Sequence, residues 1–164
     1  LLVSDGQRAE FPFGVEIESD SPIGADRLMT WNGVGSHAES SIAAPSRQWY
    51  LAEGATGGPF NLYYLLQNTG EAAASVTVRL LRPAPDPPVT QTYEVPGRSR
   101  FTIWVDQIPG FEATDVSADI SATQPIVVER AMYLDTDIPF VAGHAAAAVP
   151  APALSLRRLA SARA

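Results

Sequence analysis

The two histidines of this 164-residue chain are the first residues whose type suggests chemistry. His37 and His144 each follow a small residue and precede an alanine. A histidine can bind a metal or titrate near neutral pH, but the chain has no cysteine and no second histidine at ligand spacing. We therefore predict that both histidines cap or hydrogen-bond the backbone where a strand ends, and that the chain binds neither a metal nor a cofactor.

A pair formed by an acid and an arginine also recurs, as Asp26-Arg27 and as Glu129-Arg130. Arg130 falls on the same face of an expected strand as Ile126 and Val128, which is the inward face. A guanidinium that loses water must be paired. We predict a structural ion pair or a backbone clamp at these positions, with a ligand-binding guanidinium as the alternative.

Aromatic residues provide a second kind of candidate site, because exposed rings stack on sugars. In strands, however, such rings are more often packed in the core or across strands, which is the interpretation we favour. The rings in question are Trp31, Tyr63, Tyr64, Trp104 and Tyr133.

Neither calcium binding nor catalysis is supported by a motif. Asp115, Asp135 and Asp137 do not have the spacing of an EF-hand loop. The chain has no Gly-x-Ser-x-Gly elbow and no His-Glu-x-x-His, and the acids at 16, 18 and 20 are typical of a solvated strand face. We predict that the protein is not an enzyme.

The elements that would position these residues are short strands with period-two alternation. In Ser75–Leu80, for example, Val76, Val78 and Leu80 share one face. Proline and glycine separate such segments, and no helix pattern appears before the C-terminal tail. About seven strands are expected between Trp49 and Val149, and they predict an all-β, Ig-like antiparallel β-sandwich; the others include 49–52, 60–67, 89–95, 101–105, 116–120 and 126–132.

Composition narrows the class of partner. Hydrophobic residues make up 46% and charged residues 18%, as in a globular chain. The net charge of -7 disfavours nucleic acid and anionic membrane surfaces. No stretch approaches the roughly 18 apolar residues that membrane insertion requires.

An internal repeat organises the chain. Ile17 and Met29 align with Ile120 and Met132 at an offset of 103, and the two histidines align at an offset of 107. Residues 1–46 are therefore expected to be the C-terminal part of a preceding repeat, which packs in cis or in trans. Residues 47–150 form the complete repeat, and 151–164 the degenerate first strand of a further one.

Several spaced segments of the complete repeat resemble a family of Ig-like repeats from exported and surface proteins of bacteria. They are Trp-Tyr-Leu-Ala-Glu-Gly-Ala-Thr at 49–56, Glu-Arg-Ala-Met-Tyr at 129–133 and Gly-His at 143–144. The resemblance implies a sandwich outside the cell and no established activity. It also implies that Glu53 is the partner of Arg130. The first copy departs from the pattern, because Thr30 replaces Tyr133.

We therefore expect a non-catalytic structural module of a cell-surface stalk or fibre. The half repeat presents apolar positions that need cover, either from neighbouring repeats or from a second copy, which would build a head-to-tail homo-oligomer or filament. The alternatives are a carbohydrate-binding or adhesive module that contacts a glycan, and an accessory domain of an exported hydrolase. The assembly candidates are Val15, Ile17, Ile23, Met29, Leu154 and Leu156.

Overall fold

The computed structural model describes residues 13–31, 33–138 and 140–152, and in these ranges it contains ten strands and one short 3-10 helix. Every strand pair in them is antiparallel, and no helix in them is long and apolar enough to cross a membrane. The prediction of an all-β antiparallel sandwich is confirmed. The elements are β1 (Asp26–Trp31), β2 (Gly35–Ser40), β3 (Ser46–Leu51), β4 (Phe60–Asn68), β5 (Ala74–Leu81), β6 (Val89–Val95), β7 (Ser99–Trp104), η1 (Val105–Gln107), β8 (Ser117–Leu134), β9 (Ala142–Ala147) and β10 (Val149–Pro150).

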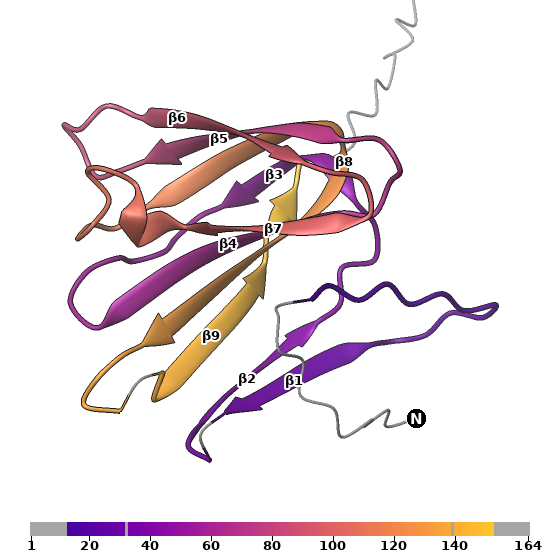
Figure 1. Cartoon of the computed structure of the whole chain (residues 1–164), viewed down its shortest axis with the longest axis horizontal. Helices are drawn as coiled ribbons and strands as arrows, with labels where there is room; N and C mark the ends of the chain where they lie inside the picture. The colour runs from indigo at the N-terminus through magenta and orange to yellow at the C-terminus, as the bar shows by residue number, and fades with distance from the viewer. Residues whose placement is uncertain (1–12, 32, 139, 153–164) are drawn as a thin grey trace, which may run out of the picture.

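The long strand β8 belongs to both sheets of the sandwich (Figure 1). Its residues 117–122 pair with β5 and with β3, in a first sheet of order β10-β3-β8-β5-β6. From residue 129 it lies between β4 and β9, in a second sheet of order β9-β8-β4-β7. Pro125 lies where β8 passes from the first sheet to the second. Proline has no N–H to donate to a neighbouring strand, so it is tolerated where the strand changes its pairing partners.

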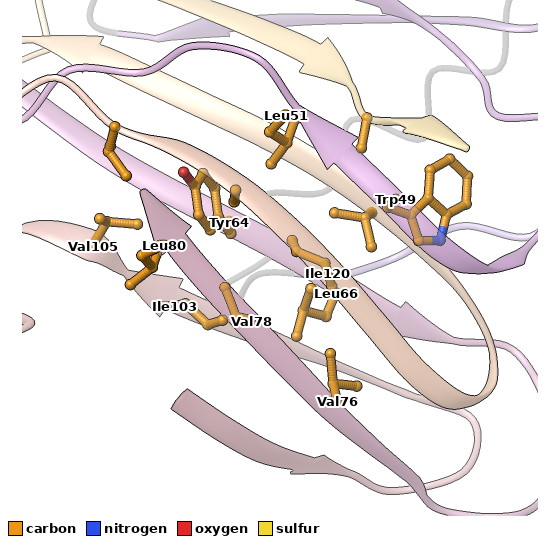
Figure 2. Packing of buried hydrophobic residues seen from close by; sticks show 14 of the residues in the cluster. Trp49, Leu51, Tyr64, Leu66, Val76, Val78, Leu80, Ile103, Val105 and Ile120 are labelled. Carbon is orange, nitrogen blue, oxygen red and sulfur yellow. The ribbon is translucent and has the colours of Figure 1, made fainter. Parts of the chain in front are cut away.

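The core lies between the two sheets and follows the predicted alternation (Figure 2). Val76, Val78 and Leu80 of β5 are each at most 1% exposed, and they face Tyr64 and Leu66 of β4, which are fully buried. Burial of one such aliphatic side chain contributes about 1.5–3 kcal/mol. The hydrophobic pattern therefore fixes which face of each strand turns inward.

One predicted core residue lies at the rim instead. Phe101 was expected to share the inward face of β7 with Ile103, but it remains 36% exposed and packs beside Tyr93 with ring centroids 5.4 Å apart. The reason is the position of β7 at the edge of the second sheet, where the opposite sheet gives only partial cover.

Two hairpins of the chain have the same register. In β1–β2, Met29 pairs with His37, and in β8–β9, Met132 pairs with His144. All six residue pairs of the first hairpin have a counterpart in the second, at the offsets of 103 and 107 on their two strands. The two hairpins are therefore equivalent position by position.

The segment before the first hairpin behaves differently from its aligned counterpart. The alignment at an offset of 103 with residues 117–132, which lie largely in strands predicted from the sequence, predicts a strand from Gly14 to Met29 as well. The strand begins only at Asp26, and residues 13–25 belong to no strand. The aligned part of β8 is held between β3 and β5. The expectation of a full strand was wrong because, in the described residues, those two partners are already occupied by β8.

The β1–β2 hairpin packs in cis on the outer face of the second sheet, where β2 lies beside β9 (Figure 1). Ala131 and Ala145 point to that outer face and are only 2% and 6% exposed. The backbone N–H of Ala147 donates to Glu39 Oε1 at 2.6 Å. The hairpin thus covers small residues of β8 and β9 without extending their hydrogen-bond ladder.

The chain after β9 returns to the first sheet. Val149 and Pro150 pair with Tyr50 and Trp49, and the N–H of Ala151 donates to the carbonyl of Gln48 at 3.0 Å. The predicted assembly residues of the tail, Leu154 and Leu156, lie outside the described residues.

Candidate functional site

Arg130 is the buried centre of a polar cluster between β8, β9 and the loop after β3, in which its side-chain partners Glu53 and His144 are exposed. It is 3% exposed, on the core-facing register of β8. Its Nη1 donates to the Glu53 carbonyl at 2.6 Å and to the Glu53 carboxylate, and its Nη2 lies 2.8 Å from His144 Nδ1. A guanidinium can only donate, so His144 Nδ1 accepts and the neutral ring carries its proton on Nε2. The cluster ties three segments of the sandwich together.

Tyr64, one of the rings considered for sugar stacking, belongs to this interior and not to the surface. Its side chain is fully buried in the core, near Arg130 and Glu53. Burial raises the pKa of the Tyr64 phenol far above its usual value, and Glu53 raises it further, while Arg130 acts in the opposite direction. Tyr64 is therefore a packing residue, as favoured from the sequence, and the sugar-stacking alternative does not apply to this ring.

The recurring pairs of acid and arginine contact each other across the two copies. Arg27 Nη2 lies 3.2 Å from Glu129 Oε2, so the arginine of the first copy binds the acid of the second. Asp26 instead accepts a hydrogen bond from Ser40 Oγ at 2.7 Å. Because the Arg27 side chain keeps 41% of its surface in solvent, this partly buried ion pair contributes about 1 kcal/mol.

His37 is placed differently from His144. Its side chain is 7% exposed, between Trp31 and Tyr133, with ring centroids 5.5 Å and 6.0 Å away. Neither ring nitrogen has a hydrogen-bond partner within the part of the chain that the structure describes. Burial lowers the pKa of His37. The positive charge of Arg27 lowers it further, and His144 makes the smallest contribution in the same direction.

Four rings form a continuous line on the outer face of the second sheet, which we call the aromatic row: Trp104 of β7, Tyr63 of β4, Tyr133 of β8 and Trp31 of β1. Successive ring centroids are 5.5, 5.9 and 5.5 Å apart. Trp104 is 39% exposed and the other three are partly buried. Aromatic pairs prefer such spacing, in tilted or edge-to-face geometry.

Polar groups border the aromatic row on both sides. On one side, Asn61 Nδ2 donates to Asp135 Oδ2 at 2.8 Å. On the other lie Glu129, its partner Arg27 and the half-buried Arg100, whose guanidinium pKa is lowered by burial. Asn61 and Arg100 were not singled out from the sequence. Period-two alternation would have identified both, because Asn61 falls on the same face of β4 as Tyr63, and Arg100 on the same face of β7 as Trp104.

Acids and histidines do not gather into a metal-binding group among the described residues. Asp115 forms an isolated bridge with Ala55, and Asp135 binds Asn61 and the N–H of Phe140. Asp115 and Asp135, two of the aspartates considered for calcium, therefore stand in separate local contacts.

The assembly candidates of the first segment are exposed. Val15, Ile17 and Ile23 are 63%, 58% and 59% exposed, and Met29 is 39% exposed. Leu28 and Val34 of the hairpin, which sequence reasoning missed, are also exposed, at 70% and 57%. Alternation within β1 would have found Leu28, because it lies on the face opposite to Met29.

Comparison with known proteins places the chain by its fold. No protein-family model and no curated protein matches it. The crystal structure of Thermotoga maritima 1070 is similar, with a TM-score of 0.60 and 14% sequence identity over 65% of this chain and 96% of that chain. The Anabaena sensory rhodopsin transducer has a TM-score of 0.45 and 25% identity over 55% of this chain and 91% of its own. The first likeness shows a shared fold, so the chain belongs to the broad class of antiparallel β-sandwiches.

Proposed function

We propose that this chain is a non-catalytic structural module of a bacterial extracellular or cell-surface stalk or fibre. In this proposal it joins a second copy or neighbouring repeats through the segment that precedes β1. The observation that carries the proposal is that residues 14–25 align with a paired part of β8, yet belong to no strand in the described chain.

The segment before β1 lacks the cover that the aligned part of β8 has, as the exposed fractions of aligned residues show. Ala118, Ile120 and Ile126 of β8 are 3%, 0% and 0% exposed, while Val15, Ile17 and Ile23 at the aligned positions are 58–63% exposed. An extended segment with free backbone groups and alternating apolar side chains is the form that adds to a sheet edge. We therefore infer that a strand partner outside the described residues covers this segment.

The extracellular location rests on the resemblance of segments 49–56, 129–133 and 143–144 to Ig-like repeats of exported bacterial proteins. The assignment of a structural role without catalysis is supported by the engagement of Arg130, Glu53 and His144 with one another in a clamp.

Light scattering over a wide concentration range tests the assembly. We expect the mass of the wild-type chain to rise with concentration, and Ile17→Asp to hold the chain as a monomer, because a buried unpaired charge opposes strand addition. Val34→Asp is the matched control, since Val34 is equally exposed but lies in the β1–β2 turn. A wild-type chain that stays monomeric throughout would contradict self-assembly and restrict the partner to neighbouring repeats.

A further inference from the structure

We propose that the aromatic row is a binding site for a neutral oligosaccharide, built jointly by the complete repeat and the β1–β2 hairpin. Trp104, Tyr63 and Tyr133 come from the second sheet, and Trp31 is brought to them by the hairpin. None of these four rings belongs to the segment that precedes β1, on which the proposed assembly depends.

The rings form two parts: a platform, in which Trp104 lies against Tyr63, and a wall, formed by Tyr133 and Trp31. Trp104 and Tyr63 are tilted by only 30° with centroids 5.5 Å apart, which is too close for two rings side by side in one plane. They are therefore offset-stacked, and Trp104, at 39% exposure, carries the open face. Tyr133 stands at 65° to Tyr63, and Trp31 at 79° to Tyr133. The C–H face of a pyranose can lie on the exposed face of Trp104, while the upright rings limit where it can slide.

Gly143 of β9 and Gly35 of β2 leave the space in which Trp31 stands. A Cβ at position 143 would lie 2.8 Å from Trp31 Cη2 and 3.0 Å from Tyr133 Cδ1. At position 35 an added Cβ would overlap the Trp31 indole, whose N–H donates to the carbonyl of Phe140. Glycine at these two positions therefore leaves room for the Trp31 indole in its observed orientation.

Unpaired polar atoms lie behind the wall. In the described residues, both ring nitrogens of His37, the Nε of Arg27 and the Oε2 of Glu39 are buried without a hydrogen-bond partner. These are four of the seven buried side-chain polar atoms that lack a partner in the described residues. Buried polar groups of folded proteins are nearly always satisfied, so four such atoms on three neighbouring side chains indicate a ligand that supplies partners. Sugar hydroxyls suit this set, because each one both donates and accepts.

The charges around the row favour a neutral sugar over an anionic one. Glu129 is paired with Arg27, Asp135 lies at the opposite border, and the whole chain carries a net charge of -7. An anionic sugar would meet like charge at the Asp135 border, and at the other border its carboxylate would have to compete with Glu129 for Arg27 and Arg100. An apolar peptide is a poorer match, since ionic and amide groups interrupt the apolar surface on either side of the rings.

Tryptophan fluorescence of the full chain provides the test. Trp49 is buried in the core at 1% exposure, so a change in emission on binding reports Trp31 and Trp104. We would titrate the protein with three neutral series: oligomers of β-linked glucose, α-linked glucose and β-linked N-acetylglucosamine. At least one series should bind saturably, and the affinity should fall tenfold or more in Tyr63→Ala and, by calorimetry, in Trp104→Ala.

Two further variants keep the test independent of folding. Tyr50→Ala removes an equally exposed ring from β3, on the other sheet, and should leave binding unchanged. His37→Phe keeps the ring packing but removes the unpaired nitrogens, and should weaken binding at least threefold. The proposal is overturned if no neutral series binds, if binding survives Trp104→Ala in a protein that melts like the wild type, or if only uronate polymers bind.

Discussion

The hairpins β1–β2 and β8–β9 have the same register but different surroundings. The face that carries Arg130 and Met132 looks into the sandwich, whereas the equivalent face with Arg27 and Met29 lies on the outer side of the second sheet. Arg130 binds Glu53 of its own repeat, while Arg27 binds Glu129 of the other copy. Local sequence therefore specifies the hairpin and its register, and the neighbouring strands decide what each side chain does.

The largest expected difference between the two hairpins lies in their ion pairs. Glu53→Gln leaves Arg130, at 3% exposure, without a counter-charge. Because the Glu53 carboxylate is 71% exposed and the Glu53 carbonyl still accepts from Arg130, the free energy of unfolding should fall by about 2.5 kcal/mol, as for a hydrogen bond to a charged group. Glu129→Gln breaks the partly exposed pair with Arg27 and should cost about 1 kcal/mol. Urea denaturation of both variants measures the difference, and equal costs would contradict the assignment of Arg130 as a clamp.

Truncation of the two aligned methionines should give the next largest contrast. Met132 packs against the core cluster, so Met132→Ala should cost about 2 kcal/mol, the lower end for such a change. Met29 is 39% exposed, and Met29→Ala should change the free energy of unfolding by roughly 0.5 kcal/mol. Thermal melts of both variants measure the two losses of stability. A larger loss for Met29→Ala than for Met132→Ala would show that the β1–β2 hairpin has a core of its own.

The repeat register and most of the core could be predicted from the sequence, because alternation and the aligned pairs are local signals. Val76, Val78 and Leu80 follow from period two alone. The aromatic row could be predicted only in part. Its four rings were named from the sequence as members of one candidate site, but Tyr64 was named with them, although it lies on the opposite, buried face of β4 from Tyr63. The docking of the hairpin could not be predicted, since nothing in the spacing indicates where a hairpin without its own sandwich will find cover.

A glycine substitution tests this docking. Gly143→Ala places a methyl group against Trp31 and Tyr133, and such overpacking should cost about 1 kcal/mol. The cost should fall on the β1–β2 hairpin and not on the sandwich, so hydrogen exchange should speed up at residues 26–40 with little change in β4 and β5. Gly70→Ala is a suitable control, because an added Cβ there meets nothing closer than 3.4 Å. Uniform acceleration over the whole sandwich would contradict docking of the hairpin as a separate unit.

The smallest expected effect is a pH dependence of the same docking through His37. Burial, Arg27 and His144 lower its pKa from the ordinary value of 6.5, so the docked hairpin holds His37 neutral. The undocked hairpin exposes the ring, which then takes up a proton below about pH 6.5. Docking is thus unaffected by His37 above that pH, and it weakens progressively as the pH falls from 6.5 toward the lowered value.

Hydrogen exchange at residues 26–40, measured from pH 7.5 to pH 5 and corrected for the intrinsic rate, should show this loss of protection. His37→Phe should remove most of it, because the aromatic contacts with Trp31 and Tyr133 remain while the titrating group is gone. Glu39 shares the face of β2 with His37, so Glu39→Gln is the control that separates a contribution of this carboxylate from that of the histidine. A pH dependence that persists in His37→Phe but disappears in Glu39→Gln would assign the effect to the carboxylate, and the difference between the two aligned histidines would then be one of packing alone.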